Sequence, residues 1–371
     1  MKLIVAILIA AAVFWLIRLM YRKTWDEGLQ VEVAFPDRVL REGDKGTLQE
    51  VITNDKFLPL PILQIKFAIT RTFRFAKDAG GDVTDQYYRN EYFTLKSYER
   101  VTRTYPFTCT RRGLFTMKNM DLICKDLFMS EEMYASIEHK ASLLVMPRRV
   151  HEREIPSDCL RLLGEIETDL KLQEDPFAFS MIREYQPYDS MHAVNWKVSA
   201  RMDKLMVNTF RTTVQRELVI ILDLNTHAQL QEDLIREELI RIAATLCAYF
   251  VGKKIPTGLL SNGCDILSHE PESVRAGADE AHVRTIEMTL GRIDTKQPCP
   301  DILPILKERM RLKNHEEILL LTNDRKDTFL DELRALRNGS DKQLYMINAF
   351  LKREPQKESC DFAIPWEIIH E

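Results

Sequence analysis

The stretch Leu218-Val-Ile-Ile-Leu222-Asp223 decides the fold class of the second half of the chain. Five consecutive apolar residues are typical of a strand in a parallel sheet, because helices cover both faces of such a sheet. Helical patterns follow at 230–254, 279–291, 301–313 and 327–337, and further strands are indicated at 257–261, 317–321, 343–349 and 362–369. This alternation predicts a doubly wound α/β domain over residues 215–371, in which ligands bind beyond the carboxyl ends of the strands.

Upstream, the hydrophobic pattern has a period of two. Leu63, Ile65 and Phe67 alternate with more polar neighbours, and several similar short runs are separated by Gly, Asn and Pro. Such a pattern predicts an antiparallel β-sandwich, which we place at residues 28–147. Residues 148–214 have weak periodicity and many charges and aromatics, and we expect connected loops with short elements there.

The amino terminus carries an apolar run from Leu3 to Ile17 without charge, Gly or Pro. Extended to Tyr21, it forms a helix of about 28 Å, which suits a hydrocarbon core of about 30 Å. A cleaved signal peptide is the competing interpretation, but only Lys2 precedes the run and no small-residue cleavage site follows it. We therefore expect a single-pass membrane anchor at residues 1–23.

Charge and cysteine content indicate which side of the membrane the body occupies. Arg18, Arg22 and Lys23 follow or end the apolar run, and the more basic flank usually faces the cytoplasm. Seven widely spaced cysteines, an odd number, suit free thiols in a reducing compartment. We expect a cytoplasmic body. The net charge of −4, with no basic block, argues against nucleic acid as a partner.

The usual catalytic signatures are absent from the sequence. There is no phosphate-binding Gly-x-x-x-x-Gly-Lys motif, no Cys-x-x-Cys and no His-Glu-x-x-His. Gly258-Leu-Leu-Ser261 has the wrong spacing for a nucleophile elbow. Glu184 and Asp189 would be the acid/base pair of an unrecognised hydrolase, but no nucleophile or metal motif accompanies them. We expect no catalytic residues and no small-molecule substrate.

One position resembles a ligand site. Asp223 and Asn225 follow the strand at 218–222, and Asp324 follows a neighbouring strand. Their oxygens are acceptable ligands for magnesium, whereas the imidazole of His227 prefers softer metals. The alternative is that an Asp after a strand caps the next loop or helix. The capping interpretation is favoured and no cofactor is expected, while Asp223, Asn225 and Asp324 are the candidate ligands if magnesium binds.

A second constellation is Arg183-Glu-Tyr-Gln-Pro-Tyr-Asp189, followed by Asn195-Trp-Lys-Val-Ser-Ala-Arg201. It suits a solvated loop, a buried ion-pair network between two domains, or a surface that recognises a partner. The preference of Trp and Tyr for burial favours the network. The candidate binding residues are Arg183, Glu184, Tyr185, Asp189, Asn195, Trp196, Lys197 and Arg201.

This constellation resembles the signature of the DUF58 family, R-E-Y-x-P-G-D followed by W-K-x-S/T-A-R. The flanks are similar too: Arg111-Arg-Gly-Leu-Phe115 and Lys125-Asp-Leu-Phe-Met129 resemble stretches that precede the signature in that family. This chain departs from the family pattern at Tyr188, His192 and Leu127. The resemblance implies a von Willebrand factor A-like domain that begins at the 218–222 strand.

The resemblance also implies what the protein binds. DUF58 proteins are commonly encoded beside MoxR-type AAA+ ATPases and are thought to act as their membrane-bound adaptors. We therefore expect a non-enzymatic, membrane-anchored adaptor or scaffold with such an ATPase as partner. The alternative function is metal-dependent, adhesion-type ligand binding. The adhesion site of A-like domains reads D-x-S-x-S, and here Asn225 and His227 stand in place of both serines.

Overall fold

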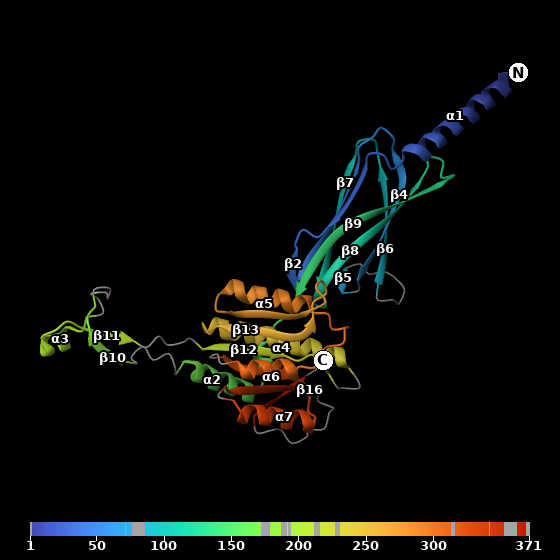
Figure 1. Ribbon diagram of the computed structural model, residues 1–371. Coiled ribbons are helices and arrows are strands. Elements are labelled where there is room, and N and C mark those ends of the chain that lie inside the picture. The colour runs from blue at the N-terminus through green and yellow to red at the C-terminus, as the bar shows by residue number, and fades with distance from the viewer. Residues whose placement is uncertain are drawn as a thin grey trace. The chain divides into compact units, whose positions relative to one another are not determined.

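The computed structural model describes residues 2–70, 72–75, 86–171, 179–186, 191, 194–210, 216–226, 231–312, 316–340, 342–351 and 362–368. The chain is a mixed α/β protein that divides into two compact units. Unit 1 comprises residues 1–148 and 290–292, and unit 2 comprises residues 149–289 and 293–371. Figure 1 shows their helices and strands.

Unit 1 begins with α1 (Lys2–Thr24), the predicted apolar helix. It is long and apolar enough to cross a membrane, and its apolar side chains are largely exposed. Its last residues are fixed to the body of the unit, because the Tyr21 hydroxyl donates a hydrogen bond to the Pro59 carbonyl at 2.8 Å. Trp25, just beyond the helix, is buried in the same core.

Two sheets follow in unit 1 and share one hydrophobic core. The first has the order β1-β3-β7-β5, with β1 (Leu29–Ala34), β3 (Lys45–Asn54), β7 (Arg100–Cys109) and β5 (Phe73–Phe75). The second has the order β2-β9-β8-β4-β6, with β2 (Val39–Arg41), β9 (Glu132–Met146), β8 (Gly113–Lys125), β4 (Leu60–Thr70) and β6 (Gln86–Leu95). All pairs are antiparallel except β2 with β9. The alternation that predicted strands is visible in β4, where Leu63, Ile65 and Phe67 are buried.

A carboxylate occupies one core position of this sandwich. Glu50 lies on the inward face of β3 between Leu48 and Ile52 and is fully buried. Neither of its carboxylate oxygens has a hydrogen-bond partner among the described residues. Burial raises the pKa of Glu50 to about 7, and the charge of Glu91 adds to this rise. The guanidinium of Arg89 acts in the opposite direction.

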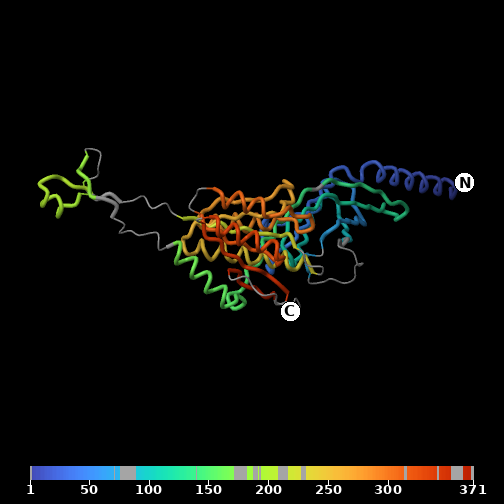
Figure 2. Tube along the Cα trace, turned by 60° about the horizontal axis from the view of Figure 1, so that its bottom comes forward, coloured from blue at the N-terminus to red at the C-terminus, as the bar shows by residue number. Residues whose placement is uncertain are grey.

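Unit 2 is built on a six-stranded sheet with the order β14-β13-β12-β15-β16-β17. Its strands are β12 (Glu217–Leu222), β13 (Thr257–Cys264), β14 (Pro271–Gly277), β15 (Glu316–Thr322), β16 (Leu344–Leu351) and β17 (Ala363–Ile368). Only β14 is antiparallel to its neighbour among these pairs. The order is that of a doubly wound sheet. In Figure 2 the colours from yellow to red follow the chain through these strands and their helices.

Helices cover the sheet. Val219 and Ile221 of β12 share a core with α6 (Leu303–Arg311) and α7 (Asp327–Asn338). Neighbouring strand residues point to the opposite face. That face is covered by α4 (Glu232–Gly252), which contacts β12, β13, β15 and β16. The described residues of the core that α6 and α7 share with β12 include none from α4. α5 (Glu280–Arg292) lies between β14 and α6 in the chain.

Residues 149–210 contain more regular structure than we expected from their weak periodicity. α2 (Ser157–Lys171) buries a stripe of apolar residues, at Cys159, Leu162, Leu163, Ile166 and Leu170, and contacts β17. β10 (Phe179–Glu184) and β11 (Met206–Phe210) form a separate two-stranded sheet, and α3 (Trp196–Met202) lies between them in the chain. The expectation of loops was therefore wrong for α2.

The buried Glu50 gives a prediction about pH. Because its pKa in the folded state lies above the ordinary value of 4.5, the folded state holds this proton more tightly than the unfolded state. Its contribution to the free energy of unfolding therefore falls as pH rises from about 4.5 to about 7. We expect Glu50→Gln to stabilise unit 1 by roughly 1–3 kcal/mol at pH 8 and by little at pH 4.5. Urea unfolding at both pH values measures this difference.

The matched control is Glu32→Gln on the neighbouring strand β1, where the side chain is exposed. It should change stability by less than about 0.5 kcal/mol at either pH. A loss of stability in Glu50→Gln at pH 8 would show that the charge of Glu50 is compensated in the fold.

Candidate functional site

Among the signature residues that the structure describes, Arg183 and Glu184 lie on β10, and Trp196, Lys197 and Arg201 lie on α3. Local hydrogen bonds hold these elements and β11 together. Arg183 pairs with Val207 and Glu184 with Met206 across the two strands. Asn195 begins α3: its side-chain oxygen accepts a hydrogen bond from the Val198 N–H at 3.1 Å. Asn195 is thus an N-cap residue, a role that Asn favours because its oxygen satisfies a free helix N–H.

A second contact fixes α3 to the strand that follows it. The Met206 N–H donates to the Ser199 hydroxyl at 2.8 Å, and the Asn195 N–H donates to the Met206 carbonyl at 2.8 Å. Ser199 is buried, and Asp203 adopts a left-handed conformation that ends the helix. Asn195 and Ser199 therefore hold α3 against β11, and other signature residues on α3 remain exposed.

Trp196 is 62% exposed, and Lys197 and Arg201 on the same short helix are exposed as well. Glu184 is also exposed, and it forms an ion pair with Lys204 at 3.3 Å, between side chains that are both more than half exposed. Such a pair contributes little to stability. The expected burial of Trp196 in an ion-pair network was therefore wrong. Residue type predicted burial, but more than half of the Trp196 side chain is exposed.

The remaining signature residues give less information. Arg183 and Tyr185 are half-buried, and the Arg183 guanidinium donates to the Glu184 carbonyl at 3.2 Å. Asp189, together with Tyr188 and His192, lies outside the described residues. The alternative of a Glu184–Asp189 acid/base pair is therefore not tested by the described residues.

The second candidate site lies at the carboxyl ends of β12, β13 and β15. Asp223 is buried, and its Oδ1 accepts hydrogen bonds from the Asn225 N–H at 3.0 Å and the Asn262 side chain at 2.7 Å. Its Oδ2 accepts from the Thr322 hydroxyl at 2.8 Å. Burial raises the pKa of Asp223 to about 6, although these hydrogen bonds act in the opposite direction and the charge of Asp324 adds to the rise. Asp223 thus ties three strands together.

Asp324 acts in a similar way one strand along. Its Oδ1 accepts from the Lys326 N–H at 2.9 Å, one residue before α7 begins. Both aspartates therefore make the loop contacts that the capping alternative predicts. Sequence reasoning missed Asn262 and Thr322, although the same rule points to them: they lie near the carboxyl ends of strands next to β12.

The fit of a magnesium ion can be judged from the oxygens present. The buried Thr226 hydroxyl and the Asn323 side-chain oxygen have no partner among the described residues, and such oxygens suit a hard cation. Both oxygens of Asp223, however, already accept protein hydrogen bonds. Within the described ranges no three His, Cys, Asp or Glu side chains lie close enough together to hold a metal. His227 lies outside them, so the magnesium site stays a prediction.

The contacts of Asp223 predict a structural role that does not need a metal. Asp223→Ala removes the acceptor for three donors, two of them on buried side chains, and we expect it to destabilise unit 2 by roughly 2–3 kcal/mol in the presence of chelator. Urea unfolding with chelator and with excess Mg²⁺ measures this. Asp331→Ala, at an exposed position on α7, is the control and should change stability by less than about 0.5 kcal/mol. A difference that appears only with Mg²⁺ would make Asp223 a metal ligand.

Comparison with known proteins supports the resemblance seen in the signature. Residues 181–290 match the model of the family described as "Protein of unknown function DUF58". No curated protein matches the sequence. Similar solved structures include the CARDB domain of a Pyrococcus furiosus protein in complex with di-metal ions, at 13% identity and a TM-score of 0.20, over 32% of this chain and 94% of that one.

Another is a protein of unknown function from Porphyromonas gingivalis W83, at 14% identity and a TM-score of 0.23, over 35% of this chain and 51% of that one. Scores this low carry no conclusion about this chain. The family match, by contrast, covers α3, β11 and β12. The N-cap residue Asn195 and the exposed Trp196 both lie within it. The match over residues 181–290 supports the DUF58 family for this part of the chain.

Proposed function

We propose that this protein is a non-enzymatic adaptor that α1 anchors in a membrane and that binds its partner through the exposed side of α3. The observation that carries the proposal is the exposure of Trp196 beside Lys197 and Arg201. Tryptophan and arginine are the residues most often responsible for binding energy at protein interfaces. An indole left in water on a well-capped helix therefore marks a site for a partner protein.

The surroundings of Trp196 support this assignment. Three further large apolar side chains of the same small unit are exposed, at Met191, Met202 and Leu205. Lys197, Arg201 and Lys204 add positive charge around them. Apolar groups rimmed by charge are typical of interaction sites. The charges favour a partner surface that is apolar at its centre and acidic at its edge.

The class of partner follows from the family resemblance. It points to a MoxR-type AAA+ ATPase, for which the protein would serve as a membrane-bound adaptor or scaffold. The α/β unit would be the von Willebrand factor A-like domain, and the strand order β14-β13-β12-β15-β16-β17 with an antiparallel edge strand supports that assignment.

Charge supports a cytoplasmic body for this adaptor. Arg22 and Lys23 lie in the last turn of α1, next to the body, whereas Lys2 lies at the other end. Basic residues are enriched on the cytoplasmic side of a membrane helix. A cytoplasmic body would meet an ATPase in the compartment that contains ATP.

The test is binding of the full chain, in nanodiscs, to a purified MoxR-type ATPase. Trp196→Ala/Arg201→Ala should weaken binding roughly 30-fold or more, since truncating such anchors costs about 2 kcal/mol or more. The melting temperature and circular dichroism should not change, because both side chains are exposed.

The matched control is Arg311→Ala/Leu312→Ala, which removes an exposed arginine and an exposed apolar side chain at the end of α6. Binding by this variant should equal that of the unmodified chain. Equal weakening by both double variants would contradict a site at α3, and loss of folding by the first would make the signature structural.

A further inference from the structure

The turn between β8 and β9, residues 126–131, lies against α1 within unit 1. The rings of Phe14 and Phe128 have centroids 4.7 Å apart. One helical turn further along, the Arg18 Nε lies 2.9 Å from the Glu131 Oε2. Figure 1 shows the β8–β9 hairpin reaching α1 at this end of the sandwich.

The tip of this turn is apolar and exposed. Leu127, Phe128 and Met129 follow one another, and between 45% and 64% of each side chain is exposed. Turns in water are normally built from Gly, Asn, Asp, Ser and Pro. Apart from the contact of Phe128 with Phe14, the described chain leaves about half or more of each of these side chains without apolar cover.

The exposure is built into the turn. Asp126 is buried, and its carboxylate accepts hydrogen bonds from the Ser130 N–H and hydroxyl, each at 2.6 Å, and from the Glu131 N–H at 3.2 Å. The Met129 N–H donates to the Asp126 carbonyl at 3.0 Å, and Met129 itself has a positive φ of 54°. The carboxylate thus closes the turn, and Leu127, Phe128 and Met129 remain partly exposed at its tip.

The contact with Phe14 fixes the depth of the tip. Phe14 lies seven residues before Tyr21, the last residue of the predicted span, which is about 10 Å along a helix. If α1 crosses a bilayer, a ring packed on Phe14 lies at a similar depth. The pairing of Arg18 with Glu131 offsets a charge that would otherwise stand alone close to the hydrocarbon.

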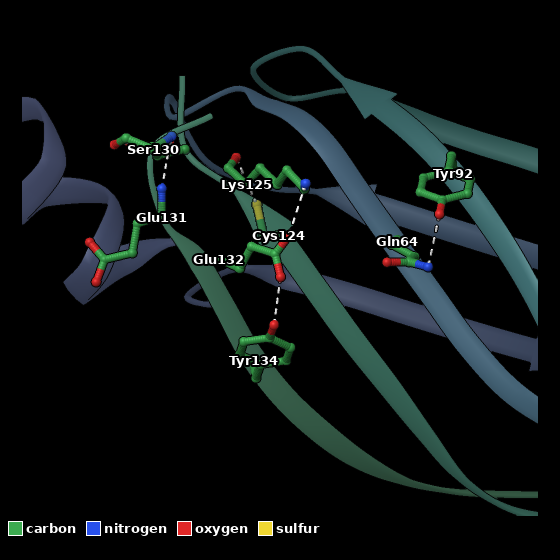
Figure 3. Close-up of polar contacts among 9 residues, drawn as sticks. Gln64, Tyr92, Cys124, Lys125, Ser130, Glu131, Glu132 and Tyr134 are labelled. Atoms are coloured by element: carbon green, nitrogen blue, oxygen red, sulfur yellow. Dashed lines mark hydrogen bonds and ion pairs between the residues drawn. The ribbon is translucent and has the colours of Figure 1, made fainter. Parts of the chain in front are cut away.

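The hairpin is apolar at its tip and polar in the strands next to the tip, as the acyl chains and headgroups are at a membrane interface. Next to the apolar tip, Glu132 accepts a hydrogen bond from the Tyr134 hydroxyl at 2.6 Å and lies 2.8 Å from the Lys125 amine (Figure 3). Tyr and Lys are typical of the headgroup level. At the end of α1, Lys56 donates to the Trp25 and Glu27 carbonyls, and the adjacent Phe57 is exposed.

We propose that the β8–β9 turn is a second membrane-binding element, and that Leu127, Phe128 and Met129 insert into the leaflet from which α1 emerges. The ligand is the lipid bilayer, at the boundary of acyl chains and headgroups. The proposal rests on the proposed anchoring by α1. Insertion of the turn adds a second attachment to the membrane beside α1, whose end is already fixed to the sandwich.

The experiment is tryptophan quenching of the full chain in phosphatidylcholine nanodiscs with brominated acyl chains. In the unmodified chain Trp15 lies within α1, so Trp15→Phe should reduce quenching and set the background. Trp15→Phe/Met129→Trp should restore quenching above that background. The control Trp15→Phe/Glu138→Trp places the indole at another exposed position on the same hairpin, nine residues further along, and should stay at background.

Each outcome decides a different point. If Trp15→Phe changes nothing, α1 does not lie in the bilayer and the anchoring itself fails. If Trp15→Phe reduces quenching but Met129→Trp does not restore it, anchoring stands and insertion of the turn is overturned. Equal quenching at 129 and 138 also overturns insertion, because the signal then does not depend on position along the hairpin. Melting temperatures in detergent confirm that each variant is folded.

Discussion

The burial of β12 between two strands and two helical layers is the constraint on which unit 2 depends. Its backbone pairs with β13 on one side and β15 on the other, and both of its faces lie under helices. A strand that is covered on both faces has to be apolar along its whole length. Polar residues can follow it only where the chain leaves the sheet. Asp223 is the first such residue, and its carboxylate joins the ends of all three strands. The same constraint thus produces the core and places a buried charge at its edge.

The patterns that predicted the fold correctly were those in which burial decides residue type. The apolar run at 218–222 and the alternation along β4 each leave one arrangement that keeps apolar groups from water. β14 was missed because it is an edge strand with a largely polar sequence, and its pairing comes from backbone groups that leave no mark on side-chain pattern. In α2 the apolar stripe was present, but frequent charges between its members concealed it.

The candidate site shows a different limit. Residue type alone indicated that Trp196 would be buried, yet the helix that carries it is held by Asn195 and Ser199 in a way that turns the indole outward. Capping preferences predict where a short helix begins, but the face it presents depends on tertiary contacts. Likewise the alternation in β3 would assign an inward position to Glu50, and only its full burial reveals a carboxylate in the core whose oxygens accept no hydrogen bond from the described residues.

The position of β17 has a consequence for synthesis. It is the last strand of its sheet in chain order, it lies at the edge, and it pairs in parallel with the apolar β16. Until residues 363–368 leave the ribosome, the nascent chain displays the open edge of β16, which is a template for pairing with other chains. Trp366, buried once β17 is in place, then closes that edge. The growing chain therefore passes through a stage at which a chaperone would protect it from aggregation.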